Sequence, residues 1–149
     1  MVEVPHKSWR TFCGVDKEVF EEHLASTLKE LSYEYEVREG PPSFILGDEP
    51  SSIYEIRAPA NFTIKVFFAS GDPILRSLYS FFGTSDALRG VCLIEVLTTK
   101  DSEPFAKRLL QGTIKKLPRK PWDLKHHPKF RTAPLALFII KRRWKRWMD

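Results

Sequence analysis

The stretch from residue 62 to 97 constrains the fold most, because it is the most hydrophobic part of the sequence. Apolar residues starting at Phe62 occupy alternate positions as far as residue 68, a period of two that predicts a strand with one buried face. Residues 91–97 are almost continuously apolar, with Glu95 as the one charge, which is typical of an inner strand covered on both faces. These two strands are expected to frame the core.

A short buried helix is predicted between these strands. Asp72 can cap it, Pro73 suits its first turn, and apolar residues follow at helical spacing as far as Phe82, before Gly83. Such a helix is short for a parallel crossover, so the two strands are more simply arranged in an antiparallel or mixed sheet.

The N-terminal part adds one helix and further strands. A helix is predicted after Asp16, because Phe20, Leu24 and Leu28 recur on one face. Before it, Trp9 and Phe12 stand in a polar setting and are interpreted as an arm that lies over the body and buries those two rings. Strands are predicted at residues 33–38, 44–46 and 53–58, with a hairpin turn at residues 59–61.

The C-terminal part is predicted to contain two more helices. One begins near Pro104 and ends at Pro118, with an apolar face and a basic face. An irregular connector follows to residue 133, and residues 134–148 then have helical periodicity. Residues 135–140 are apolar all round and must be covered by protein or lipid; a short strand over them is the alternative.

The element order predicts an α+β fold. We expect residues 1–149 to form a single two-layer domain, with a mainly antiparallel or mixed sheet of four to five strands and three to four helices. Residues 118–149 are expected to form a basic C-terminal extension packed on that domain. The length suits one such core.

Charge is distributed unevenly along the chain. Residues 115–149 contain twelve Lys or Arg and two Asp, so they carry +10, whereas residues 1–114 contain twelve basic and seventeen acidic residues and carry −5. Such an asymmetry indicates either an anionic partner for the C-terminal part or contact with the acidic part of the same chain.

The basic C-terminus is the one candidate site that the sequence indicates. Lys and Arg hold phosphates and aromatic rings stack on bases, so the run from Trp144 to Trp147 offers both chemistries that a nucleic acid needs. An amphipathic basic helix is also typical of a peripheral anchor on an anionic membrane, and an acidic protein could bind it as well. Alternatively, the two indoles cover the core. The predicted binding residues are Lys115, Lys116, Arg119, Lys120, Lys141, Arg142, Arg143, Trp144, Lys145, Arg146 and Trp147.

Catalytic and metal-binding motifs are not recognisable, so we expect a non-catalytic binding domain without a cofactor. There is no glycine-rich phosphate loop and no HExxH. Glu34 and Glu36 are expected to be solvated on a strand face. His126 and His127 are adjacent, but neighbouring side chains diverge and no cysteine stands nearby, so no metal site is predicted. An enzyme or small-ligand carrier with a pocket between sheet and helices is the remaining alternative.

Cys13 and Cys92 are far apart in sequence and form no CxxC pair, which favours a reduced compartment over a disulfide scaffold. The first ten residues contain no apolar segment of a signal peptide, and no apolar run reaches the roughly 18 residues of a membrane span. We therefore expect a cytoplasmic location.

Overall fold

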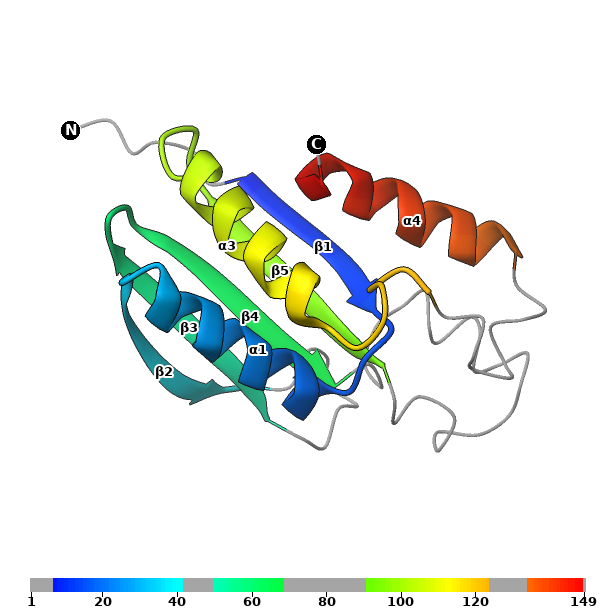
Figure 1. Cartoon of the computed structure of the whole chain (residues 1–149), viewed down its shortest axis with the longest axis horizontal. Helices are drawn as coiled ribbons and strands as arrows, with labels where there is room; N and C mark the ends of the chain where they lie inside the picture. The colour runs from blue at the N-terminus through cyan, green and yellow to red at the C-terminus, as the bar shows by residue number, and fades with distance from the viewer. Residues whose placement is uncertain (1–6, 42–49, 69–90, 124–133, 149) are drawn as a thin grey trace.

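The computed structural model describes residues 7–41, 50–68, 91–123 and 134–148. This part of the chain forms one five-stranded antiparallel sheet with strand order β1-β5-β4-β3-β2, accompanied by three helices (Figure 1). The elements are β1 (Lys7–Cys13), α1 (Lys17–Glu30), β2 (Glu34–Gly40), β3 (Ser51–Ala58), β4 (Phe62–Phe68), β5 (Cys92–Thr98), α3 (Glu103–Lys116) and α4 (Pro134–Met148).

The elements with a clear hydrophobic period follow the sequence prediction. β4 and β5 are the two apolar strands, and they pair antiparallel, so a parallel crossover between them is wrong. β3 and β4 form the expected hairpin. Residues 135–140 belong to α4 throughout, so the alternative of a strand there is also wrong. The strand predicted at 44–46 and the helix predicted after Asp72 lie outside the described residues.

The rings of Trp9 and Phe12 are buried, as expected. The interpretation of this segment as an arm is wrong, because Lys7–Cys13 form the edge strand β1. Among the described strands, β1 pairs with β5 alone, from Lys7 opposite Thr98 to Cys13 opposite Cys92. Successive side chains of a strand point to opposite faces, yet neighbours such as Phe12 and Cys13 are both buried. Burial on both faces removes the polar alternation that would have indicated a strand.

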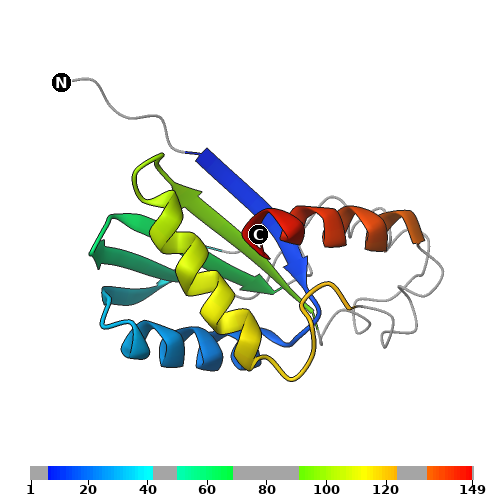
Figure 2. The same cartoon turned by 45° about the horizontal axis from the view of Figure 1, so that its top comes forward.

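Helices α1 and α3 lie side by side across one face of the sheet (Figures 1 and 2). The side chains of Leu24 and Leu109 are fully buried, and so are Ile64 and Val96 of the central strands. The two helices approach closely at Gly112, where an added Cβ would stand 2.7 Å from Thr27 Cγ2. Apolar side chains therefore fill the space between these helices and the sheet.

None of the described helices is long and apolar enough to cross a membrane.

Cys13 and Cys92, distant in sequence, are register partners on β1 and β5. Both thiols are free and buried. Burial raises the pKa of the Cys92 thiol well above its usual value, and a hydrogen bond with Cys13 raises it further. Cys92 is therefore protonated in the folded protein at neutral pH.

This raised pKa predicts a loss of stability at alkaline pH. An unfolded thiol loses its proton near about pH 8.5, whereas the folded Cys92 keeps it. The Cys92 thiol therefore makes its full contribution to stability below the pKa of the unfolded thiol, and this contribution decreases as the pH rises above that pKa. We expect the free energy of unfolding, measured with urea, to decrease between about pH 8 and pH 10, and the decrease to be smaller in Cys92→Ala. An identical decrease in both proteins would contradict this assignment.

Candidate functional site

The buried stripe of α4 is formed by Ile140, Trp144 and Trp147, which recur at helical spacing. Their side chains are 3%, 0% and 1% exposed, respectively. Each indole of α4 meets the ring of Trp9 on β1 edge-on, with 5.2 Å between ring centroids. Three tryptophans thus form one cluster that attaches α4 to the first strand of the sheet.

Two side chains of α4 donate hydrogen bonds to the free edge of β1. Trp144 Nε1 donates to the carbonyl oxygen of Phe12 at 2.6 Å, and the Arg143 guanidinium donates to the carbonyl oxygen of Arg10. Because β5 is the one neighbour of β1 among the strands that the structure describes, alternate backbone carbonyls on the other side of β1 lack a strand partner there. Helix α4, which runs along β1 in Figure 1, covers this edge and satisfies two of those carbonyls.

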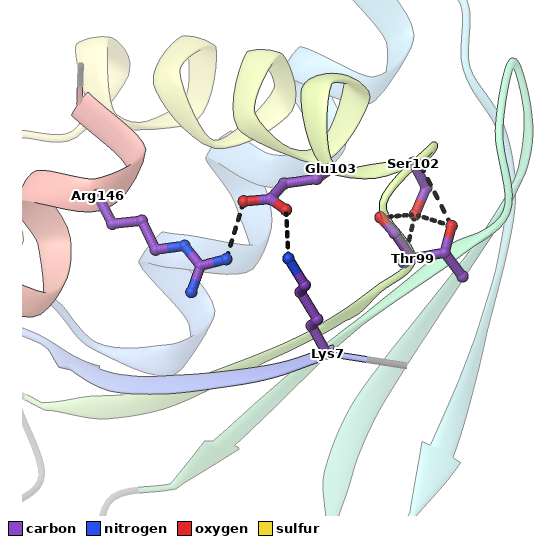
Figure 3. A network of polar contacts seen from close by, with 5 residues as sticks. All are labelled: Lys7, Thr99, Ser102, Glu103 and Arg146. Carbon is purple, nitrogen blue, oxygen red and sulfur yellow. Dashed lines mark hydrogen bonds and ion pairs between the residues drawn. The ribbon is translucent and has the colours of Figure 1, made fainter. Parts of the chain in front are cut away.

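The last turn of α4 is held by an ionic contact with the start of α3. The Glu103 carboxylate lies between the Arg146 guanidinium and the Lys7 ammonium (Figure 3), and its oxygens are 2.8 Å and 3.9 Å from their nitrogens, respectively. The hydrogen bond from Arg146 is the main reason why the pKa of Glu103 is lowered. Beside it, Ser102 and Thr99 bond to each other and order the turn that precedes α3.

The cations of α4 therefore fall into two groups. Arg143 and Arg146 bond to the body of the protein. Lys141, Arg142 and Lys145 are exposed, and within the described part of the chain they have neither a hydrogen bond nor an ion pair. The sequence offered acidic residues of the same chain as one means of neutralising the C-terminal charge, and among the described residues of α4 this occurs at Arg146 alone.

The unpaired cations line a groove on one flank of α4. This cationic groove has a volume of about 540 Å³, and its lining consists of Trp122, Phe138, Lys141, Arg142, Lys145 and Met148. A second hollow, of about 430 Å³, adjoins it and shares Trp122, Phe138 and Lys141. Lys120 enters this second hollow, with its ammonium 5.6 Å from the centroid of the Trp122 ring. The groove thus combines positive charge with two aromatic rings.

The other predicted binding residues are dispersed. Lys115, Arg119 and Lys120 are exposed. Lys116 pairs with Glu30 of α1 at 2.8 Å, so its charge is partly compensated. Trp144 and Trp147 are buried, so in this structure they hold the helix and offer no ring to a partner.

Sequence reasoning missed the exposure of Phe138. Residues 135–140 were expected to be covered all round, yet Leu135 is 71%, Phe138 60% and Ile139 39% exposed. Trp122 packs partly against the core, and it also lines the groove. A helical projection could have placed Phe138 beside Lys141 and Lys145, because these positions share one flank.

Sequence reasoning also missed a buried polar cluster at the start of α1. The Lys17 ammonium donates to Glu21 at 2.8 Å and to Ser52 at 2.9 Å, and the Tyr54 hydroxyl donates to Glu21 at 2.8 Å. Burial, followed by the bond to Glu21, raises the pKa of Tyr54. These groups satisfy one another, so the cluster joins α1 to β3.

The two acidic residues that were predicted to be solvated are exposed in the structure. Glu34 and Glu36 are exposed, and Glu36 pairs with Arg57 across the β2–β3 ladder at 2.8 Å. His126 and His127 lie outside the described residues.

Comparison with protein-family models finds no match for the chain, and comparisons with curated proteins and with solved structures find no similar protein.

The two indoles of α4 make a matched pair for a stability test. Trp144→Phe leaves the Phe12 carbonyl without its donor, whereas Trp147→Phe removes a buried indole N–H that has no hydrogen-bond partner. The ring contacts that are lost are similar, because both indoles meet Trp9 at 5.2 Å. We expect Trp144→Phe to lower the free energy of unfolding by about 1–3 kcal/mol more than Trp147→Phe, as measured by urea denaturation. Equal losses would show that the bond to Phe12 contributes nothing.

Proposed function

We propose that the protein is a non-catalytic binding domain that uses the cationic groove of α4 to hold the phosphates of a nucleic acid. The observation that carries this proposal is the set of three unpaired cations in the groove, Lys141, Arg142 and Lys145. Ammonium and guanidinium groups are the usual ligands of phosphate oxygens, and those of this set are still free to bind.

The pattern of ion pairing on α4 favours binding of an anionic partner over the alternative that the exposed cations are only solvated. Arg143 and Arg146, on the flank towards β1 and α3, are bonded within the protein. The cations on the other flank gather around an apolar hollow and repel one another. An anionic ligand in the groove would remove this repulsion.

The buried tryptophans change the mechanism that the sequence suggested. Trp144 and Trp147 fix the rotation of α4 about its axis, and this rotation sets which cations face outward. Their contribution to binding would therefore be indirect: they position the cations, and the cations contact the phosphates.

Substitution of the three groove cations tests the proposal. We expect Lys141→Gln, Arg142→Gln and Lys145→Gln together to weaken binding to an oligonucleotide at least about tenfold at low salt. Each phosphate contact contributes about 0.7–0.9 to the slope of log K against log salt, so the slope should become shallower by about 2–3. Fluorescence anisotropy with a labelled oligonucleotide, over a series of salt concentrations, measures the affinity and its dependence on salt.

The matched control removes the same charge elsewhere. Lys29 of α1, Lys100 in the turn before α3 and Arg108 of α3 are also exposed, and none of them lines the groove. Their triple Gln variant should bind almost as tightly as the unmodified protein. Equal losses in the two triple variants would mean that net charge alone drives binding, and the groove would then have no special role.

A second candidate function is peripheral binding to an anionic membrane, which the exposed apolar residues Leu135, Phe138 and Ile139 beside the cations favour. In that case Leu135→Ser with Ile139→Ser should lower co-sedimentation with vesicles that contain phosphatidylserine, while oligonucleotide binding stays unchanged. Vesicles of phosphatidylcholine alone are the control. Absence of co-sedimentation with either vesicle would exclude this function.

A further inference from the structure

The composition of the cationic groove points to the form of nucleic acid that it fits. A ligand that used phosphates alone would need cations alone, yet aromatic rings also line this hollow: Phe138 is 60% exposed and Trp122 is half-buried. Exposure to water does not stabilise an apolar phenyl ring, whereas stacking on an unpaired base would bury the ring.

We propose that the groove binds single-stranded nucleic acid in preference to a duplex, with Phe138 and Trp122 as base-stacking residues. This inference rests on the proposed function, because it names the ligand class of the same groove. In a duplex the bases are stacked on each other and their faces are unavailable, whereas an unpaired strand can turn its bases onto protein rings.

The arrangement of the groove residues along α4 suits such a strand. Phe138, Lys141, Lys145 and Met148 follow one another at spacings of three or four residues, so they form a row on one flank. Lys141 and Lys145 are one turn apart, which is about 6 Å along the axis. A strand laid along this row would meet a ring at Phe138 and then two successive cations.

The size of the groove also favours unpaired nucleotides. Its volume of about 540 Å³ lies in the range of small-ligand pockets, roughly 300–1,000 Å³. A duplex presents a wide convex surface that such a recess cannot receive. Lys120 stands 5.6 Å above the Trp122 ring, so a base entering the second hollow would meet both a ring and a cation.

The fluorescence of Trp122 can report the binding of a base at this residue. Of the four tryptophans, Trp9, Trp144 and Trp147 are buried, so Trp122 is the one that an added base can reach. We expect quenching of tryptophan fluorescence when a single-stranded oligonucleotide of about a dozen bases is added, and little quenching with an abasic strand of the same length. Trp122→Phe should keep the affinity, because it keeps a ring, and should lose the quenching.

The affinity test compares three ligands that share one backbone length: a single strand, its duplex and the abasic strand. The single strand should bind at least about tenfold more tightly than either of the others at equal salt. Phe138→Ala should weaken single-strand binding by about 5- to 100-fold, as expected for the loss of one stacking ring, and should change duplex binding little. Leu135→Ala is the matched control, because Leu135 is exposed on the same helix but does not line the groove.

The outcomes separate the inference from the proposed function. One outcome is that all three ligands bind equally and Phe138→Ala behaves like Leu135→Ala, while the triple variant of Lys141, Arg142 and Lys145 still loses binding. The groove then holds phosphates alone, and the single-strand proposal is overturned. If no oligonucleotide binds at low salt, the proposed function fails and this inference fails with it.

Discussion

The attachment of two indoles of α4 to the edge of β1 determines the rest of the site. Trp144 and Trp147 meet Trp9 at 5.2 Å, and Trp144 donates a hydrogen bond to the Phe12 carbonyl. An edge strand left open exposes unpaired carbonyls to other chains, and a helix laid over it removes that liability. In this protein the same contact also fixes the orientation of the C-terminal helix, so protection of the sheet and presentation of the cations have one physical cause.

Helical geometry then divides the charges of α4. Residues advance by about 100° around the axis, so burial of Trp144 places Arg142 on the far side, whereas Arg143 and Arg146 fall on a flank that reaches β1 and α3. Their bonds to Arg10 and Glu103 follow from that placement. Lys141 and Lys145, one turn apart on the opposite flank, meet the hollow beside Trp122. One rotation of the helix thus gives Arg143 and Arg146 bonds within the protein and leaves the other cations of α4 exposed.

The sequence predicted the elements whose burial is periodic. The alternation that begins at Phe62 and the stripe of Phe20, Leu24 and Leu28 indicated β4 and α1 correctly, because each element buries one face. It did not indicate β1, since Phe12 and Cys13 are buried on opposite faces and no polar alternation remains. The sequence showed which cations and tryptophans lie on α4, but long-range contacts determine which of them are buried, bonded or exposed.

The bond from Trp144 to Phe12, 132 residues away in sequence, has no local signal, and neither does the presence of Trp122 and Phe138 in the lining of one groove. The exchange rate of the Trp144 indole N–H tests this attachment most directly. In heavy water, followed by nitrogen-edited NMR, the account expects this N–H to exchange as slowly as the backbone amides of β5, and the Trp122 indole to exchange far faster. A Trp144 indole that exchanges as quickly as that of Trp122 would show that α4 is not held on the edge of β1, and would contradict the account.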